Sequence, residues 1–452
     1  MISLSVWKKL QVVLLISTTT AIASPAQTFT TLASFDGLNG TQPMSLTQGA
    51  DGNLWGTTFR GGQTNCGVVF KMTSSGVLSV AFTFKCKLGK QPGGVTLGTD
   101  GKFYGTTDAG GPSDLGTVFK LTPRGSAKVL INFNGTDGSY PQASLTEGTD
   151  GNFYGVTHSG AINYNGTIFK TTPTGTLTTL YDFDSTHGSQ PFVEPIQGTD
   201  GNFYGAAYTG GAYGLGTVYK ITPAGSLTVL HDFGGSESDG NSPEGGLLQG
   251  ADGNFYGTTA WGGPDNDGTV FKITPSGAFT TLHAFAGADG GFPCGTLIQA
   301  TDGNFYGTTG NGGAYGDGTI FQMTAAGTVT TLHTFDGADG IDPLNLVQDT
   351  NDTFYGPTYL PNEGTIYSLS MGLGPFVTFV RSSGKVGQAA GVLGQGFTGT
   401  TSVSFNGTAA RFKVRSDTLL NATVPAGATT GFVKVTTPSG TLSSNVPFQI
   451  VP

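Results

Sequence analysis

The chain has 452 residues and a formal net charge of −9, and charged residues make up only 11% of it. Its 76 glycines lack the three-residue period of collagen, and its 31 Phe and 15 Tyr supply more apolar surface than a disordered chain contains. The acidic balance argues against a nucleic-acid partner, because phosphate contacts need clustered Lys and Arg. Aromatic segments separated by many glycine-rich turns instead predict an all-β fold.

Residues 1–26 have the pattern of a secretory signal peptide. Lys8 and Lys9 precede an apolar stretch over residues 10–22, which is followed by small-residue cleavage sites. The alternative is an uncleaved anchor, but the apolar stretch is short for a membrane span of roughly 20 residues. We therefore expect a secreted, periplasmic or cell-surface protein with no transmembrane segment after removal of the signal peptide.

A six-residue element, D-G-N-F-Y-G, recurs along the chain at intervals of 49 to 52 residues. Each copy is followed by a G-T-V-F-K element and, in most repeats, by T-P-x-G. A period of about 50 residues with four strand-like segments is typical of propeller blades. The copies begin at Asp51, Asp100, Asp150, Asp200, Asp252 and Asp302, and a degenerate seventh copy begins at Asn351.

Each repeat divides into four strands, which we call A to D. In the third repeat these are residues 144–147, 152–157, 166–172 and 177–183. An Asp-Gly turn joins strand A to strand B and a Pro-Thr-Gly turn joins C to D, because Gly accepts the backbone angles of tight turns. Longer loops join B to C, and D to strand A of the next repeat.

The order of the strands predicts a closed ring. The first D strand, residues 28–35, precedes the first A-B-C triplet, whereas no D strand follows the last triplet, residues 346–369. We therefore predict a seven-bladed β-propeller over residues 27–371, in which the N-terminal strand completes the last blade and removes an exposed edge. The aromatic residues that end the D strands are expected to pack between blades: Phe35, Phe84, Phe133, Phe183, Phe233, Phe285 and Phe335.

The repeat breaks at residues 372–375, and residues 375–452 carry shorter β-like runs. These runs lie at 403–405, 418–424 and 432–436. They predict a small immunoglobulin-like β-sandwich.

The repeats resemble the tandem GloVer repeat of bacterial exported proteins. That consensus runs Y-G-T-T, G-G, G-T-V-F-K-x-T-P-x-G and T-x-L-x-x-F, and the segments 256–259 and 268–272 match it closely. The resemblance covers about residues 28–370. It implies an exported propeller and no agreed biochemical activity.

The C-terminal segment resembles an IPT/TIG domain, which is an immunoglobulin-like module. The matching pieces are residues 394–397, 403–409, 424–427 and 437–440. In exported bacterial proteins such domains usually act as spacers or interaction modules. The D-G-N-(L/F)-(W/Y) element is also similar to repeats of streptogramin lyases and sensor-kinase propellers, but the chain shows no distinctive His and Glu set that supports lyase activity.

The three cysteines suggest one disulfide. Cys66 and Cys86 are nearly opposite each other across the C–D hairpin that turns at residues 74–76. We predict a disulfide between them, which export permits, and a free Cys294.

The five histidines fall into two groups. His158 lies in a B–C loop and His187 in a D–A loop of the same repeat, so they could face one cleft. The other three share a D-strand column with apolar and aromatic residues, and we expect them to serve packing. That column contains His231, His283 and His333 beside Ala33, Phe82, Ile131 and Tyr181.

The most informative functional pattern is the contrast between conserved turns and variable loops within the chain. The A–B and C–D turns barely change from repeat to repeat, as expected of a scaffold. The B–C and D–A loops vary and lie on the opposite rim, where function concentrates. Their aromatic residues could stack on sugar rings or pack against neighbouring loops. The candidate residues are Arg60, Asp108, Asp114, His158, Tyr164, Tyr208, Tyr213, Trp261, Asp265 and Tyr315, with His187 added from the D–A loop.

We predict no metal site and no cofactor. The repeated Asp of D-G-N offers one carboxylate in a tight turn, which is too few oxygen ligands for calcium. The D–A turns at residues 336–340 and 134–138 carry more oxygens, so weak calcium binding there stays an alternative to solvated turns.

These patterns favour a non-catalytic binding or scaffold protein. The chain contains no G-x-S-x-G, H-E-x-x-H or phosphate-loop motif. We expect a monomer whose variable rim contacts a glycan or a cell-surface protein. The alternative is a polysaccharide lyase or glycoside hydrolase on the same rim, with Arg60, His158 and His187 as its first candidate residues.

Overall fold

The computed structural model describes residues 27–360 and 363–451, so the predicted signal peptide lies outside the described residues. Within those residues every element of regular secondary structure is a strand, β1 to β39, which confirms the all-β prediction. None of the described segments forms a helix long and apolar enough to span a membrane.

Six antiparallel sheets of the described chain are each built from four consecutive strands. The first three contain β2 (Thr41–Gln48), β3 (Leu54–Arg60), β4 (Val68–Met72) and β5 (Leu78–Thr83); β6 (Lys90–Leu97), β7 (Phe103–Ala109), β8 (Thr117–Leu121) and β9 (Ala127–Asn132); and β10 (Thr146–Glu147), β11 (Phe153–Thr157), β12 (Thr167–Thr171) and β13 (Leu177–Asp182). The next three contain β14 (Ile196–Gln197), β15 (Phe203–Ala207), β16 (Thr217–Ile221) and β17 (Leu227–Asp232); β18 (Leu248–Gln249), β19 (Phe255–Thr259), β20 (Thr269–Ile273) and β21 (Phe279–Ala284); and β22 (Ile298–Gln299), β23 (Phe305–Thr309), β24 (Thr319–Met323) and β25 (Val329–Thr334).

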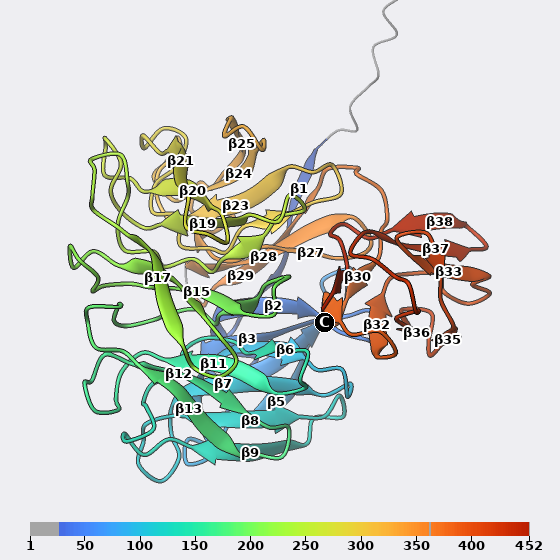
Figure 1. Ribbon diagram of the computed structural model, residues 1–452, viewed down its shortest axis with the longest axis horizontal. Coiled ribbons are helices and arrows are strands. Elements are labelled where there is room, and N and C mark those ends of the chain that lie inside the picture. The colour runs from blue at the N-terminus through green and yellow to red at the C-terminus, as the bar shows by residue number, and fades with distance from the viewer. Residues whose placement is uncertain (1–26, 361–362, 452) are drawn as a thin grey trace, which may run out of the picture.

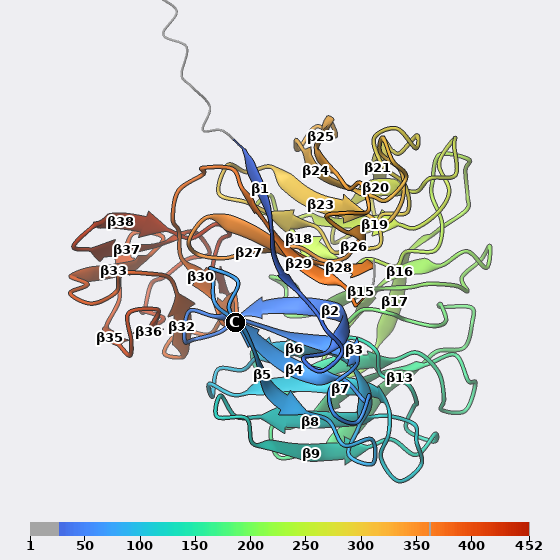
Figure 2. The same cartoon turned by 180° about the vertical axis from the view of Figure 1, so that it is seen from behind.

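A further antiparallel sheet, of five strands, joins the two ends of the repeat region. Strand β1 (Thr28–Ser34) pairs antiparallel with β29 (Thr365–Ser370), with Thr28 opposite Ser370 and Ser34 opposite Thr365. Figures 1 and 2 show the blue β1 lying beside the orange C-terminal strands of this sheet. The pairing covers the edge of β29 and links the start of the repeat region to its end. The other strands of the sheet are β26 (Ile341–Pro343), β27 (Val347–Gln348) and β28 (Thr353–Leu360).

The Asp-Gly-Asn turns form because each Asp ties the turn and the next strand together. Asp150 accepts hydrogen bonds from the Asn152 N–H (3.0 Å) and from the Tyr154 hydroxyl (2.9 Å), while Gly151 has a φ of +77°. The repeated Asp is therefore a structural residue. The same Tyr-to-Asp bond recurs in Tyr104–Asp100, Tyr204–Asp200, Tyr256–Asp252 and Tyr306–Asp302.

Neighbouring sheets are joined by aromatic stacking. The ring of Tyr154 stacks on Phe203 of the next sheet with centroids 3.8 Å apart, and Phe183, at the end of its D strand, packs edge-on against Tyr219 at 5.5 Å. Phe183 is fully buried. Because these contacts repeat around the chain, each sheet buries its aromatic residues only when its neighbour is present. Equivalent stacks are Trp55–Phe103, Tyr104–Phe153, Tyr204–Phe255, Tyr256–Phe305 and Tyr306–Phe354.

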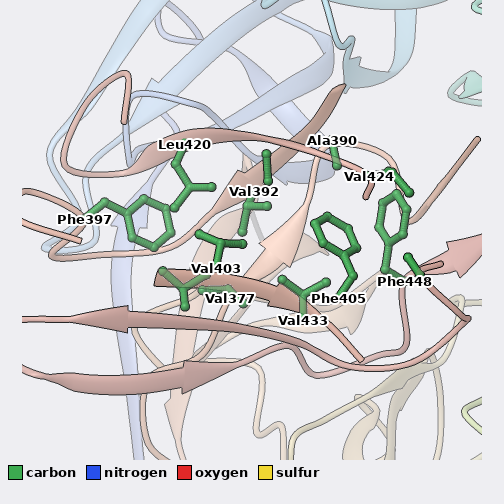
Figure 3. Packing of buried hydrophobic residues seen from close by; sticks show 13 residues of the cluster. Val377, Ala390, Val392, Phe397, Val403, Phe405, Leu420, Val424, Val433 and Phe448 are labelled. Atoms are coloured by element: carbon green, nitrogen blue, oxygen red, sulfur yellow. The ribbon is translucent and has the colours of Figure 1, made fainter. Parts of the chain in front are cut away.

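The C-terminal region forms a separate lobe beside the repeat sheets (Figures 1 and 2). Two four-stranded antiparallel sheets and one short parallel pair make up this lobe. Their inward side chains, including Val392, Val403, Leu420, Val433 and Phe448, form one buried cluster (Figure 3). The strands are β30 (Thr378–Phe379), β32 (Ala389–Leu393), β36 (Leu419–Thr423) and β35 (Phe412–Val414); β34 (Thr408–Ala409), β33 (Ser402–Phe405), β37 (Val433–Thr437) and β38 (Gly440–Ser443); and β31 (Ser383–Gly384) with β39 (Gln449–Ile450).

Candidate functional site

The repeat sheets present two faces with different connections. The A–B and C–D turns, such as residues 149–152 and 173–175, lie on one side, which we call the turn face. The B–C and D–A loops leave the opposite ends of the strands, and we call that side the loop face. The A strands of neighbouring sheets contact one another at the centre, where Thr96 donates a hydrogen bond of 2.6 Å to the Leu145 carbonyl.

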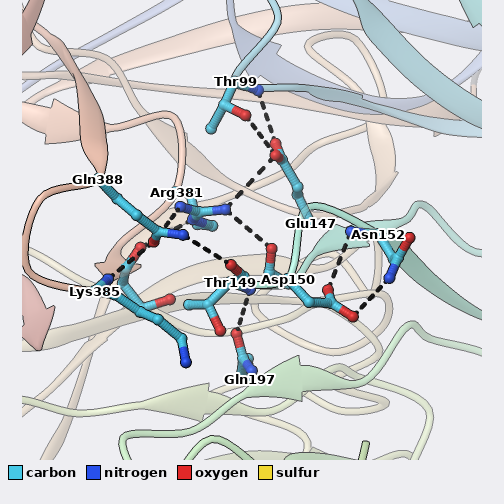
Figure 4. Close-up of polar contacts among 11 residues, drawn as sticks. Thr99, Glu147, Thr149, Asp150, Asn152, Gln197, Arg381, Lys385 and Gln388 are labelled. Carbon is cyan, nitrogen blue, oxygen red and sulfur yellow. Dashed lines mark hydrogen bonds and ion pairs between the residues drawn. The ribbon is translucent and has the colours of Figure 1, made fainter. Parts of the chain in front are cut away.

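The C-terminal region covers the turn face. Its side chains bind the A–B turns or the ends of the A strands of several sheets rather than one. Arg381 donates to the Gly148 carbonyl (3.0 Å) and Gln388 to the Thr149 carbonyl (3.3 Å), as Figure 4 shows in part. Further bonds run from Thr418 to the Ala50 carbonyl (2.8 Å), from Asn445 to the Gln299 carbonyl (3.5 Å) and from Gln449 to the Gln249 side chain (2.9 Å).

A set of Glu and Gln side chains links the sheets below this lobe. Each stands at the end of an A strand and accepts a hydrogen bond from a backbone N–H in the A–B turn of the preceding repeat. We call these four residues the axial ring. The bonds run from the N–H groups of Thr99, Thr149, Thr199 and Ala251 to Glu147, Gln197, Gln249 and Gln299.

Two departures from this pattern coincide with the docking site of the C-terminal region. Leu97 occupies the position of the axial ring in the second repeat, and it packs in one apolar cluster with Trp55, Phe103 and Leu393 of the C-terminal region. Glu147 is the acidic member of the ring, and its carboxylate lies 3.7 Å from the Arg381 guanidinium (Figure 4). Their side chains are only 6% and 11% exposed, so the charges meet away from water.

On the loop face, His158 lies beside an aromatic ring that contacts a second one, and the charge of Asp108 acts on it. Its ring is 4.9 Å from that of Phe192, which is 5.0 Å from Tyr208. Gln142 donates a hydrogen bond of 3.1 Å to Asp108. Burial lowers the pKa of His158 and raises that of Asp108, although each group's charge favours ionisation of the other. The structure thus groups His158, Tyr208 and Asp108 from three successive repeats.

Three further titratable groups come together from the next repeats. Burial raises the pKa of Glu244 to about 7, and the charge of Asp342 adds to this effect. Burial also raises the pKa of Asp342 to about 6. Cys294 lies near both carboxyl groups, and burial with their negative charge raises its pKa as well. Among the described residues neither the Glu244 nor the Asp342 carboxyl group has a charged partner of opposite sign.

Exposed aromatic side chains occupy the B–C loops of four consecutive repeats. Tyr164, Tyr213 and Tyr315 are 77%, 59% and 68% exposed, whereas Trp261 is 38% exposed and contacts Phe292 at 5.1 Å. The rings of the three tyrosines are exposed to solvent, while Trp261 takes part in loop packing. Together these four residues form what we call the aromatic rim.

The structure does not bring His158 and His187 into contact. His187 lies beside the outer-strand residue Tyr181 and binds Asp184 at 2.9 Å. Partial burial disfavours the Asp184 carboxylate, but hydrogen bonds from His187 and Thr186 outweigh it and lower its pKa to about 2. Arg60, at the exposed end of β3, lies 5.9 Å from the Phe59 ring. The enzyme hypothesis predicted a cluster of Arg60, His158 and His187. Among the described residues these three side chains do not form such a cluster.

The remaining histidines and two of the three cysteines have structural partners. His231, His283 and His333 bind Asp239, Asp289 and Asp339 at 2.7–2.8 Å. A disulfide joins Cys66 to Cys86, with their Cα atoms 5.4 Å apart, and Cys294 is free. Asp114 accepts a hydrogen bond from Lys90, and Asp265 is exposed. Within the described ranges no group of three or more His, Cys, Asp or Glu side chains is arranged to hold a metal ion.

Sequence reasoning missed Glu244, Asp342 and Phe192, because no recurring motif includes these three residues. Each lies directly beside a proline that recurs in these loops, as Pro191, Pro243 and Pro343. The residue after that proline differs in every repeat, from Met44 and Gly93 to Cys294 and Leu344, whereas the residue before it is Gln in three repeats and varies in the others. Variation beside a fixed proline was the signal that could have identified them.

Comparison with solved structures shows propellers at low identity. Virginiamycin B lyase from Staphylococcus aureus is 15% identical with a TM-score of 0.54, over 76% of this chain and 99% of that chain. The extracellular domain of a proposed hybrid two-component system from B. thetaiotaomicron is 12% identical with a TM-score of 0.53, over 94% of this chain and 57% of that chain. These similarities show the fold alone. A search of the curated proteins found no significant match.

The sequence itself matches one family description over most of its length. The Gloeobacter/Verrucomicrobia repeat matches residues 17–198 and 191–413. The chain therefore belongs to the Gloeobacter/Verrucomicrobia repeat family.

Proposed function

We propose that the protein is an exported, monomeric, non-catalytic binding protein that uses its loop face to contact a glycan or a cell-surface protein. In this proposal residues 1–26 are a signal peptide, residues 27–371 form a seven-bladed β-propeller and residues 375–452 form an IPT/TIG immunoglobulin-like domain. The protein needs no cofactor for this role.

The carrying observation is the position of the C-terminal region. It binds A–B turns through Arg381, Gln388 and Thr418 and the ends of A strands through Asn445 and Gln449, and so covers the turn face. The loop face remains open, and it is the face whose residues differ from repeat to repeat. Variable loops on a rigid scaffold are the usual location of binding sites.

The chemistry of the loop face suits a hydroxyl-rich ligand. Tyr164, Tyr213 and Tyr315 expose ring faces for stacking, and nearby carboxylates and amides can accept or donate hydrogen bonds. The net charge of −9 disfavours strongly anionic ligands. A neutral glycan or a neutral to basic protein surface therefore fits best.

The test is a panel of polysaccharides incubated with purified residues 27–452, reading retained protein and released oligosaccharide together. A matched variant replaces the four aromatic-rim residues Tyr164, Tyr213, Trp261 and Tyr315 by Ala. Val80→Ala, an exposed change on the outer strand β5, is the control. Binding that the rim variant loses and the control keeps supports the proposal, whereas equal binding by both variants contradicts it.

A glycan-cleaving enzyme on the same face is the second candidate. It is favoured by Glu244 and Asp342, because a pKa of about 7 would keep Glu244 partly protonated near neutral pH while Asp342, with a pKa of about 6, is mostly ionised there. This candidate predicts release of oligosaccharide by the wild type. Glu244→Gln and Asp342→Asn would then abolish release while leaving retention unchanged, and no release by the wild type would exclude it for that panel.

A further inference from the structure

One D–A loop is longer than its counterparts and borders a groove. In two repeats the D-strand histidine pairs with an Asp six residues later, as in His283–Asp289 and His333–Asp339. In the loop after β17 the pair is His231–Asp239, eight residues apart. The two extra residues accompany a groove of about 710 Å³ between β17 and β21. The tip of this loop, residues 235–238, is exposed.

The conformation of the loop is fixed by a carboxylate whose two oxygens both accept hydrogen bonds. Asp239 is only 5% exposed in its side chain and binds His231 Nε2 at 2.8 Å with one oxygen. Its other oxygen accepts the N–H groups of Gly234 and Gly235 at 3.0 and 3.1 Å. His231 in turn stacks on Phe279 of the next sheet, with centroids 3.8 Å apart and planes 3° apart. These contacts fix the groove between the B–C and D–A loops of the fourth repeat and the outer strand β21.

The walls of the groove carry an aromatic ring, a carboxylate and hydroxyl groups. Tyr213 lines it with a ring that is 59% exposed. Asp232 lines it with a carboxylate, one oxygen of which binds the Ala212 N–H at 2.8 Å. The hydroxyls of Ser236 and Thr280 also border it, and both residues are exposed.

We propose that this groove is a subsite for a neutral saccharide, with a sugar ring stacked on Tyr213 and its hydroxyls bound by Asp232 and the serine and threonine hydroxyls. The inference rests on the proposed binding function and assigns it to one place. An aromatic platform beside a few fixed acceptors is the arrangement that recognises an amphipathic ring. Asp232 and the neighbouring Glu237 disfavour uronates and sulfated sugars, because like charges repel.

The chain contains its own matched control in the sixth repeat. Ala212-Tyr213-Gly214 and Ala314-Tyr315-Gly316 are identical tripeptides in equivalent B–C loops. The sixth repeat also has the stacked histidine, His333 on Phe29, but carries Thr334 where the fourth has Asp232, and its D–A loop lacks the insertion. A general contribution of exposed tyrosine would therefore appear equally at both positions.

The experiment uses residues 27–452 and measures retention on cellulose, mannan, starch and β-1,3-glucan, followed by titration with soluble oligosaccharides of whichever polymer binds. We expect Tyr213→Ala and Asp232→Asn each to weaken binding about tenfold or more, the scale of a binding hot spot. Tyr315→Ala, in the repeat without the groove, should weaken binding less than Tyr213→Ala does, and Val80→Ala on the outer strand β5 should change it less than about twofold, the scale of a neutral contact. Thermal unfolding of each variant checks that the fold is intact.

The outcomes separate the subsite from the wider proposal. Selective loss with Tyr213→Ala and Asp232→Asn supports the groove. Loss of binding only in the fourfold rim variant, with Tyr213→Ala unaffected, overturns the groove and leaves loop-face binding standing. Absence of wild-type binding to every neutral glycan overturns the groove together with the glycan form of the proposed function.

Discussion

Arg381 of the C-terminal region reaches Glu147 of strand β10, with the guanidinium nitrogen Nη1 3.7 Å from the carboxylate oxygen Oε1. Glu147 also accepts hydrogen bonds from the backbone N–H and hydroxyl of Thr99, so the same carboxylate joins two repeats and the C-terminal lobe. The other members of the axial ring carry neutral amides. The pair therefore distinguishes one position of the ring from the others.

We predict that removing either charge weakens docking of the C-terminal region. Glu147→Gln keeps a hydrogen-bond acceptor but leaves the buried Arg381 without its negatively charged partner. Arg381→Gln leaves the buried Glu147 carboxylate without its positively charged partner. Each single change should lower the free energy of unfolding by about 3 kcal/mol, and the double variant should lose less than the sum. Urea unfolding of the four proteins measures this coupling.

The control is Lys102→Gln, in an exposed ion pair with Asp100, which should lower the free energy of unfolding by less than about 1 kcal/mol. Additive losses would contradict a specific pair.

Leu97 makes a second, apolar contribution to the same orientation. It is 4% exposed and shares a cluster with Leu393, Trp55 and Phe103. Leu97→Gln restores the residue type of the axial ring but buries an amide against apolar side chains, so it should destabilise docking by about 2 kcal/mol. We expect faster thermolysin cleavage at residues 371–375. Leu97→Met keeps the volume and should digest like the wild type, and equal digestion of the Gln variant would refute this role.

Two buried tyrosines should be replaceable by phenylalanine with a gain in stability. Tyr219 and Tyr367 are fully buried, and neither hydroxyl has a hydrogen-bond partner among the described residues. The fold therefore carries the cost of two desolvated hydroxyl groups. Tyr219→Phe and Tyr367→Phe should each raise the free energy of unfolding by about 1 kcal/mol. The repeats already use Phe at this position, in Phe70, Phe119, Phe169, Phe271 and Phe321.

Differential scanning calorimetry measures both changes. Tyr154→Phe is the control, because its hydroxyl donates to Asp150 and its removal should be destabilising. A lower melting temperature for Tyr219→Phe would show that the hydroxyl has a stabilising partner.

The carboxyl groups of Glu244 and Asp342 predict a pH dependence of stability. Their pKa values are raised in the folded protein, from 4.5 to about 7 and from 3.8 to about 6. Between the unfolded and folded values the folded state binds more protons than the unfolded state, so stability falls as pH rises. Their contribution is complete below about pH 4 and is lost as the pH rises through about 6 for Asp342 and about 7 for Glu244.

Glu244→Gln and Asp342→Asn should remove this part of the pH dependence. Urea unfolding of the wild type and both variants between pH 4.5 and 7.5 measures it, and each variant should gain stability relative to the wild type towards pH 7.5. Glu237→Gln, at an exposed loop position, should follow the wild-type profile. Unchanged slopes in both variants would show that these carboxyl groups ionise normally in the folded protein.

Local sequence was sufficient to predict the strands of each repeat. In the third repeat strand B was expected at residues 152–157 and is found at Phe153–Thr157, and strand D was expected at 177–183 and is found at Leu177–Asp182. Asp-Gly turns and the aromatic residues that follow them act within one hairpin, so the signal is local. The all-β class follows from the same signals.

The functional side chains could not be placed in this way. His158 and His187 belong to one repeat, yet the fold puts His158 beside Phe192 and His187 beside the outer-strand residue Tyr181. Glu244, Cys294 and Asp342 come from three different repeats, yet the charge of Asp342 raises the pKa of Glu244 and both carboxyl groups raise the pKa of Cys294. Closeness across repeats depends on how sheets pack side by side, which no short stretch of sequence encodes.

By itself, then, the sequence determined the repeat, the strands within it and the break after residue 371, because hydrogen-bonded hairpins depend on residues a few positions apart. Only the tertiary structure decided which face stays open. That choice depends on Arg381 meeting Glu147 and on Leu393 packing beside Leu97, contacts between residues more than 200 positions apart. Each partner alone resembles an ordinary variation within the repeat or the tail, and its role appears only when folding brings the two surfaces together.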